Sequence, residues 1–400
     1  MAVVTQVTNL TSTSLSRAID VAFRGSACDG ARMKTPLRRR RELTALLTVA
    51  LALVASIVGV ASADERTGIY PGLPFIECPD ELPPSDYDPC STPDFANRYG
   101  WINGVSLGRT GSPKAKQWAR IPLMTMGNNI LIGNRVDGED REYTIDIRTF
   151  LVSPKGSDRN YGRSPLIPVR TVAFGSIPVE VTLQLQQRLD ADGYPVPFYL
   201  RSVENVTAED GGRRTKVEPA ALAADVDVQI RSLKVDGNDV GLDDSCGTGT
   251  RSRLSVTSKP LDVLEEPGYV GPSFYGKSFD TFDPAEAFYG LYGGTLEGSI
   301  DIASLEGCST RSGDDVSPVL TAALSGPGNP VTLQVGSFNC VKYTDDFSMA
   351  LPPQPGATTP EEIGCAQNYY ETPDESVTNP RVRTVPRPLD FPDEAPRQVE

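Results

Sequence analysis

The sequence predicts an all-β protein, either an antiparallel sandwich or a barrel-like fold, and three observations support this prediction. From about Trp101 to Tyr343, apolar and polar residues alternate with a period of two, as in strands that bury one face. Turn signals of the hairpin type separate these runs. Helix signals are few, and the best is Asp283-Pro284-Ala285-Glu286, an N-cap followed by proline at the first helical position.

The clearest predicted strand covers residues 177–187. Its apolar residues fall on one face and its polar residues on the other; the apolar set is Ile177, Val179, Val181, Leu183 and Leu185. Residues 226–235 repeat the pattern, with a slip that predicts a β-bulge near Arg231-Ser232. Further strands are predicted around residues 296–302 and 331–335. The predicted turns are Asp137-Gly138, Asp192-Gly193, Asp236-Gly237-Asn238 and Gly326-Pro327-Gly328-Asn329.

Residues 1–63 are predicted to be a leader that ends in a secretory signal peptide. Arg38–Arg41 form a basic cluster, an apolar run extends from Leu43 to Val60, and Ala61-Ser62-Ala63 before Asp64 fits a processing site. Translation from Met33 would leave an ordinary signal peptide. An apolar run of about 18 residues also fits an uncleaved anchor. We expect cleavage, which places the mature chain in the medium or the cell envelope.

The mature chain, residues 64–400, divides by composition into four parts. Residues 64–99 are a proline-rich arm without periodicity. Residues 100–210 and 216–345 form two β units if the glycine-rich and charged stretch near residue 211 is a boundary, and one large β unit if it is not. Residues 346–400 are proline-rich and acidic, with little apolar surface to offset the entropy of ordering, so this tail is predicted to be largely flexible apart from the region around Cys365.

The charge and the absence of histidine exclude several classes of function. Of the 38 basic and 52 acidic residues, 8 and 3 lie in residues 1–63, which leaves 30 and 49 in the mature chain. A surface with this acidic excess repels nucleic acid and anionic lipid. The chain contains no histidine, which excludes Ser-His-Asp and Cys-His hydrolases and HExxH zinc proteases. No cofactor is predicted.

Six cysteines of the mature chain predict a disulfide framework for an oxidising compartment: Cys78, Cys90, Cys246, Cys308, Cys340 and Cys365. Fifteen pairings are possible, and the sequence alone does not choose among them. We expect Cys78 with Cys90, because the segment between them is short, and Cys308 with Cys340, across adjacent strands. Cys246 with Cys365 follows by elimination.

Two motifs resemble catalytic sites, but we interpret neither as one. Gly104-Val105-Ser106-Leu107-Gly108 matches the G-x-S-x-G nucleophile elbow, yet no histidine is present to take the serine proton. Pairs of carboxylates, which glycosidases use, occur as Asp225 with Asp227, Asp243 with Asp244, Asp314 with Asp315, and Glu297 with Asp301. In an acidic protein such pairs are expected to be solvated, so no catalytic residue and no metal ligand is predicted.

An aromatic-rich segment is the candidate binding surface. It contains eight rings among glycine, proline and aspartate: Tyr269, Phe274, Tyr275, Phe279, Phe282, Phe288, Tyr289 and Tyr292. Aromatic rings on a loop stack on sugars or form hot spots for a protein partner. The alternative is that the rings pack over an open end of the β-sheets.

Residues 293–302, Gly307-Cys308, Leu320–Ala323 and Ser325–Asn329 together resemble a segment of secreted actinobacterial proteins that have no assigned activity. Val235–Gly241 is similar to the same group, and the resemblance covers about residues 165–340. It implies an exported envelope protein and assigns no functional residue.

The predicted function is therefore that of a secreted or envelope-associated β protein that acts by binding or as structure, with an envelope component or a protein as partner, and not as an enzyme. The mature chain is not expected to span the membrane. Two alternatives stay open. One is a pore or peripheral component of an outer lipid layer, because alternating strands also build membrane barrels. The other is a glycan hydrolase that works without histidine.

Overall fold

The computed structural model describes residues 70–77, 95–173, 177–209, 212–265, 288–290, 293–336, 340, 342–345, 349–365 and 385–399. The chain divides into two compact units, Met1–Ala63 and Asp64–Glu400. All of the described residues belong to the second unit.

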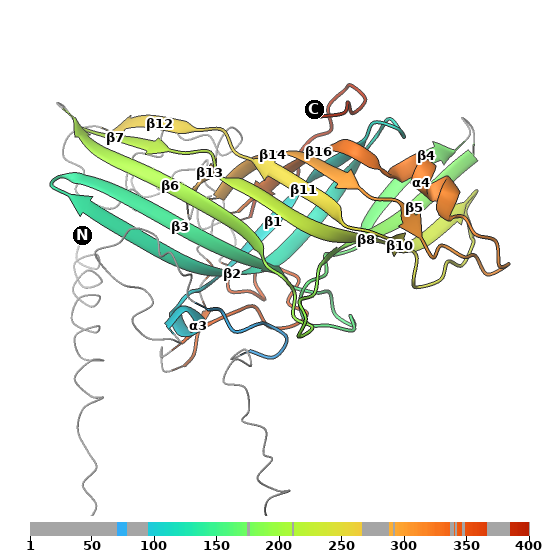
Figure 1. Ribbon diagram of the computed structural model, residues 1–400, viewed down its shortest axis with the longest axis horizontal. Helices are drawn as coiled ribbons and strands as arrows, with labels where there is room; N and C mark the ends of the chain where they lie inside the picture. Colours follow the sequence, from blue (N-terminus) through green and yellow to red (C-terminus); the bar gives the residue numbers. More distant parts are fainter. Residues whose placement is uncertain are drawn as a thin grey trace, which may run out of the picture. The chain divides into compact units, whose positions relative to one another are not determined.

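Eight strands, called the barrel strands below, form the main body (Figure 1): β1 (Trp101–Ser112), β2 (Gln117–Asp137), β3 (Asp140–Leu151), β6 (Phe198–Glu209), β8 (Ala221–Val235), β11 (Ser252–Thr257), β14 (Gly293–Ile302) and β16 (Gly326–Val335). The other strands are β4 (Ile167–Ala173), β5 (Ile177–Gln187), β7 (Gly212–Val217), β9 (Asn238–Asp239), β10 (Gly247–Thr248), β12 (Leu261–Glu265), β13 (Phe288–Tyr289), β15 (Leu305–Glu306), β17 (Lys342–Tyr343) and β18 (Ala350–Leu351). The described helices are α3 (Phe95–Tyr99) and α4 (Ser317–Leu324).

The eight barrel strands form a closed antiparallel barrel in the order β1, β2, β3, β6, β8, β11, β14, β16 and back to β1. Two long-range pairings complete the ring. β1 pairs with β16, with Ser106 opposite Val335, and β6 pairs with β8 only at Leu200–Leu222 and Arg201–Ala221. The prediction of an all-β antiparallel fold is confirmed, and of the two architectures expected the barrel is the one formed.

The predicted boundary near residue 211 does not separate two β units. The four strands before it (β1, β2, β3 and β6) and the four after it (β8, β11, β14 and β16) form one closed ring. The two groups are joined by pairing of β6 with β8 and of β1 with β16. The stretch near residue 211 instead lies between β6 and β7, which form an antiparallel pair at one end of the barrel with Glu209 opposite Gly212. The alternative of one large β unit is the correct one.

The local predictions around β5 and β8 are confirmed. β5 spans Ile177–Gln187. Its pairing with β8 shifts where Thr182 opposes Ser232 and Leu183 opposes Ile230, which leaves Arg231 as the extra residue of a bulge. The turn at Asp236-Gly237 joins β8 to β9, and both residues have positive φ, 50° and 77°. This is the type I′ geometry, which a glycine at the second position favours.

The predicted turn at Gly326–Asn329 is wrong, because these residues begin β16. The register between β14 and β16 shifts between Ile300 and Ile302, so the glycines accommodate an irregular strand pairing rather than a hairpin. The best helix signal, at residues 283–286, lies outside the described residues. Helix α4 was not predicted.

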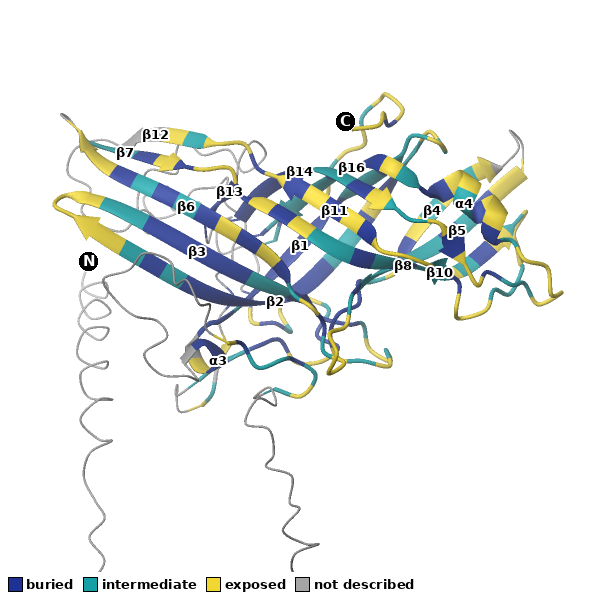
Figure 2. Ribbon diagram, viewed as in Figure 1, coloured by how far each residue is buried: buried dark blue, intermediate teal, exposed yellow. Residues whose placement is uncertain are grey.

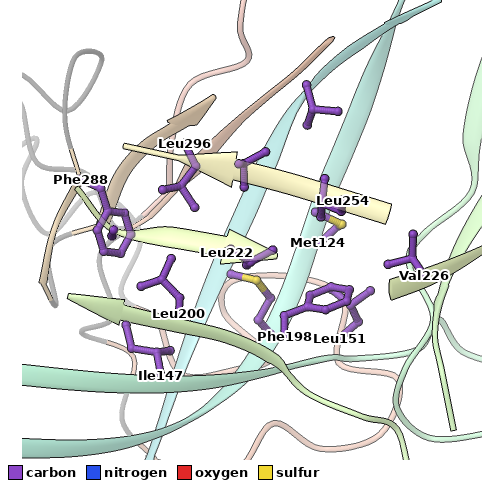
Figure 3. Packing of buried hydrophobic residues seen from close by; sticks show 14 of the residues in the cluster. Met124, Ile147, Leu151, Phe198, Leu200, Leu222, Val226, Leu254, Phe288 and Leu296 are labelled. Atoms are coloured by element: carbon purple, nitrogen blue, oxygen red, sulfur yellow. The ribbon is translucent and has the colours of Figure 1, made fainter. Parts of the chain in front are cut away.

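The core lies inside the barrel. Buried apolar residues from seven of the barrel strands meet there, together with the partly buried Ile102 of β1, and Figure 3 shows Met124, Ile147, Phe198, Leu222 and Leu296 directed into this interior. Along β6, buried and exposed residues alternate, as Figure 2 shows. In the middle of β2, by contrast, an unbroken run of residues is buried, because both faces of the strand are covered.

Segments from both ends of the second unit cover the outer face of β1, β2 and β3. Leu73 and Ile76 of the arm pack with Trp101, Leu131 and Phe150, all of which point away from the barrel interior. The side chain of Asn97 in α3 exchanges two hydrogen bonds of 2.9 Å with the backbone of Ile76. The described part of the arm thus contributes a second apolar layer outside the barrel.

Two segments of the tail that was predicted to be largely flexible have defined contacts with the barrel: residues 349–365, which include the exempted region around Cys365, and residues 385–399. The first segment packs on the outer face of β1 and β2, where the Thr125 hydroxyl donates to the Ala357 carbonyl at 2.6 Å. The second lies along the same two strands and is described below. Few apolar side chains are needed, because barrel side chains hydrogen-bond to the tail backbone and because proline loses little conformational entropy on ordering.

The structure contains two disulfides among the described residues, Cys246–Cys308 and Cys340–Cys365. The expected pairs Cys308–Cys340 and Cys246–Cys365 are therefore wrong. Cys246 precedes β10 and Cys308 follows β15, and the antiparallel pairing of these short strands brings the two cysteines together. Cys340 forms an isolated antiparallel β-bridge with Asn103 of β1, beside the segment that ends at Cys365. Cys78 and Cys90 lie outside the described residues.

Candidate functional site

The serine of the G-x-S-x-G motif lies in the middle of a strand. Ser106 belongs to β1, is buried, and its hydroxyl donates to the Gln334 carbonyl of β16 at 3.1 Å. A nucleophile elbow needs a sharp turn between a strand and a helix, and an extended strand does not provide one. The motif therefore has a structural explanation.

The carboxylate pairs lie in ion pairs, in local turns or on a strand. Glu297 and Asp301 lie on β14, where the Asp301 carboxylate accepts a hydrogen bond from the Gly328 backbone at 2.8 Å. Asp225 lies 3.1 Å from Arg251 and 3.5 Å from Arg253, and Asp227 lies 3.5 Å from Arg188. Asp315 accepts a hydrogen bond from the Ser317 backbone at the start of α4, which with the Ser317 hydroxyl holds the pKa of its carboxyl below the usual range. None of these pairs lines the interior of the barrel. Among the described residues, no group of three or more acidic or cysteine side chains is placed to hold a metal ion.

A polar cluster on the outer face of β3 and β6 has a different character. The buried Asp146 carboxylate accepts hydrogen bonds from Arg201 at 2.6 and 2.9 Å and from the Tyr199 hydroxyl at 2.7 Å. Burial, followed by the hydrogen bond to Asp146, raises the pKa of Tyr199. The same contact with Asp146 raises the pKa of Arg201, so both partners stay protonated. The cluster ties two neighbouring strands, and we assign it a structural role.

The interior of the barrel contains a cavity of about 110 Å³. Each of the eight barrel strands contributes to its wall, together with Ile167 of β4, Leu183 and Leu185 of β5, and Phe288 of β13. The wall residues from the eight strands are Ser106, Thr110, Ile121, Met124, Met126, Ile147, Thr149, Leu151, Phe198, Leu200, Leu222, Val226, Val228, Leu254, Leu296, Ile300, Ile302, Val331, Leu333 and Val335.

The wall is apolar apart from three hydroxyl groups and carries no charge. Besides Ser106, described above, Thr149 donates to the Asn128 side-chain oxygen at 2.7 Å, and Thr110 completes the set. Two of these hydroxyls therefore direct their protons to protein acceptors and not into the cavity. Proton transfer and metal binding need ionisable or strongly polar groups, which this wall does not provide. The cavity is suited to hold an apolar molecule.

The aromatic candidates divide between described and undescribed residues. Phe288 and Tyr289 are buried as strand β13, which pairs with Gly293 and Gly294 of β14, and the Phe288 ring lines the cavity. Figure 3 shows this ring at one side of the core, directed toward Leu200 and Leu222. The remaining candidates lie outside the described residues: Tyr269, Phe274, Tyr275, Phe279, Phe282 and Tyr292.

Sequence reasoning assigned many of the wall residues to buried strand faces but did not identify a cavity. The alternation at residues 183–185, 226–228, 296–302 and 331–335 marks side chains that do line it. A cavity depends on how closely those faces approach each other across a closed barrel, and the alternation of a single strand carries no such information.

The chain matches no protein-family model, no curated protein and no solved structure. Within the part of the chain that the structure describes, no helix has the length and apolar character needed to cross a membrane.

Proposed function

We propose that the protein is exported and acts by binding a small apolar ligand, such as a hydrocarbon or the end of an alkyl chain, inside its barrel. The observation that supports this proposal is the uncharged, apolar cavity, to whose wall each of the eight barrel strands contributes. Eight-stranded barrels have an interior wide enough either to be filled by side chains or to hold one small ligand. The two disulfides are compatible with an extracellular or other oxidising environment.

The volume of the cavity limits the size of the ligand. A cavity of about 150 Å³ lined by apolar side chains stays free of water and binds benzene or xenon. The cavity described above, at about 110 Å³, is of the same order. Burial of about four methylene groups contributes about 3 kcal/mol, which corresponds to a dissociation constant of millimolar or weaker. A longer chain reaches higher affinity only if the wall side chains move to admit it.

The pore and the hydrolase alternatives receive no comparable support. A water-filled pore requires a polar lumen, whereas the described wall of this barrel is apolar. A glycosidase requires two carboxyl groups that face one substrate. Asp225 and Asp227 are paired with arginines, and none of the candidate acidic pairs contributes to the described cavity wall.

Benzene as a probe, with matched filling variants, tests the proposal. Val331→Phe places a ring in the cavity, whereas Val172→Phe places the same ring on β4 at a position that is 56% exposed. Benzene at about ten times its dissociation constant contributes about 1.4 kcal/mol. We expect the Tm of the wild type and of Val172→Phe to rise by a few degrees, and the Tm of Val331→Phe to stay unchanged.

A different pattern would identify the cavity as a packing void. If benzene leaves the wild-type Tm unchanged and Val331→Phe is more stable than the wild type, the barrel interior has a structural role only. Far-ultraviolet circular dichroism of all three proteins establishes that the barrel is intact in each.

A further inference from the structure

Residues 385–399, called the tail below, run along the outer face of β1 and β2 with a bend at residues 393–394. At its start, Val385 packs against a buried apolar cluster that contains Val105 of β1 and the disulfide cysteines Cys340 and Cys365. At its end, the Val399 backbone donates to the carbonyl of Gly328 in β16 at 2.9 Å (Figure 1, dark red). Between these points the tail joins no strand of the barrel.

Side chains of β1 and β2 recognise the backbone of the tail. The Trp118 indole nitrogen donates to the Glu394 carbonyl at 2.8 Å, and an Arg120 guanidinium nitrogen donates to the Leu389 carbonyl at 3.0 Å. Arg109 donates to the Asp390 carbonyl. Carbonyl groups are present in every peptide, so these contacts fix the path of the backbone without requiring a particular side chain.

Proline and one aromatic ring supply the selectivity. Pro386 and Pro396 are the buried residues of the tail, and the Phe391 ring between them lies 4.9 Å from the Arg120 guanidinium. Pro396 sits on Gly111, where a Cβ atom would come within 2.4 Å of the proline Cβ. Gly111 is thus the residue that lets a proline approach β1. Grooves for proline-rich peptides likewise combine aromatic and donor side chains with an extended backbone.

The tail is held on a limited number of contacts. Phe391 is 41% exposed, and most tail residues between the two buried prolines are exposed. Ordering of each residue costs about 1–2 kcal/mol in backbone entropy, less for proline, so an occupant with so few anchors is only marginally stable in place. A second peptide with the same features can therefore compete with it.

We propose that the outer face of β1 and β2 formed by Arg109, Gly111, Trp118 and Arg120 is a peptide-binding site for a segment of another protein that contains proline and an aromatic residue. The tail is its intramolecular occupant and blocks the site until it is displaced. The site selects for proline and for the ring rather than for charge, because Arg109 and Arg120 donate to backbone carbonyls of the tail, and the acidic Glu394 of the tail pairs with the tail's own Arg397 at 2.8 Å. This site is separate from the barrel cavity and does not depend on the proposed ligand.

The experiment uses the full chain and a fluorescent synthetic peptide with the sequence of residues 385–399, followed by fluorescence anisotropy. Phe391→Ala combined with Pro396→Ala weakens the chain's own tail and leaves the site unchanged. A tethered occupant has an effective concentration in the millimolar range, so the wild type is expected to bind the peptide weakly. We expect the weakened chain to bind it at least tenfold more tightly, because a larger fraction of its sites is open.

Two further substitutions in the weakened chain test where the peptide binds. Trp118→Phe removes the indole donor and keeps a ring, and Gly111→Ala adds only the methyl group that meets Pro396. Both are expected to return the affinity toward the wild-type value, and a peptide with both buried prolines replaced by alanine is expected to bind less well. Val319→Ala, on the exposed face of α4, serves as the control.

Three results would overturn the proposal. The first is that the weakened chain binds the peptide no more tightly than the wild type does. The second is that Trp118→Phe and Gly111→Ala leave peptide binding by the weakened chain unchanged while urea denaturation shows a folded barrel. The third is that the weakened chain forms concentration-dependent dimers and does not bind free peptide, which would assign this face to a second copy of the chain.

Discussion

Leu296→Ala is the substitution whose cost the structure defines best. Leu296 lies in β14, is 1% exposed, and contributes to both the core and the cavity wall. Removal of three carbon atoms forfeits about 2.4 kcal/mol of transfer free energy at about 0.8 kcal/mol each. Because the new space adjoins an existing cavity, we expect little collapse around it, and the cavity contribution raises the loss to about 4 kcal/mol.

Urea denaturation of wild type and Leu296→Ala measures this loss as a shift in midpoint at constant m-value. The matched control is Leu166→Ala, at a position that is 50% exposed, where we expect less than about 0.5 kcal/mol. Benzene is expected to restore part of the stability of Leu296→Ala, since the enlarged cavity offers it more contacts. A loss below about 1.5 kcal/mol, or no response to benzene, would refute the placement of this side chain between core and cavity.

Three further predictions concern the covalent and polar contacts. Replacement of both cysteines of Cys246–Cys308 by serine is expected to lower the free energy of unfolding by about 4 kcal/mol, and the same replacement in Cys340–Cys365 by about 3.5 kcal/mol. The difference arises because the disulfides close loops of different length, with sequence separations of 62 and 25 residues. Equal shifts in the urea midpoints of the two variants would contradict this order. Asp146→Asn is expected to cost about 2 kcal/mol, a value reduced because Arg201 is half exposed, and a double-mutant cycle with Arg201→Gln isolates the pair. Hydrogen bonds from a lysine and from two backbone N–H groups lower the pKa of Glu362 to about 2, so its contribution to stability is present above about pH 4.5 and is lost as the pH falls through about 2. Glu362→Gln should therefore flatten the change in Tm between these pH values, and an unchanged profile would contradict the assignment.

The sequence predicted the strands that bury one face and missed those that bury two. β5 and β8 alternate clearly because one side meets the core and the other meets solvent, and even the bulge at Arg231 is visible as a slip in this pattern. Asn128 and Asn129 of β2 are both buried, because α3 and residues 349–365 cover the outer face of this part of the strand. Such a strand shows no alternation from which to assign its faces.

Contacts between distant segments account for the remaining errors. The disulfide pairing depends on β10 meeting β15, two strands of two residues each that no local pattern marks. The tail was assigned as flexible from its composition, whereas Trp118 and Arg120 hold it through backbone carbonyls. The candidate cavity is likewise a property of the closed ring, and the pairing of Leu200 with Leu222 that closes it joins residues on either side of a predicted boundary.

The pairing of β1 with β16 has a consequence for how the chain reaches its native state. Ser106 of β1 pairs with Val335 of β16, so β1 lacks its second neighbouring strand until a segment more than 200 residues further along the chain has been made. Until then, the sheet nucleated by the first hairpin presents a bare edge and an uncovered apolar face, which is the condition in which newly made β proteins aggregate. Folding dominated by such remote pairings is slow. We therefore expect overproduction to yield inclusion bodies unless synthesis is slowed or a holding chaperone is supplied.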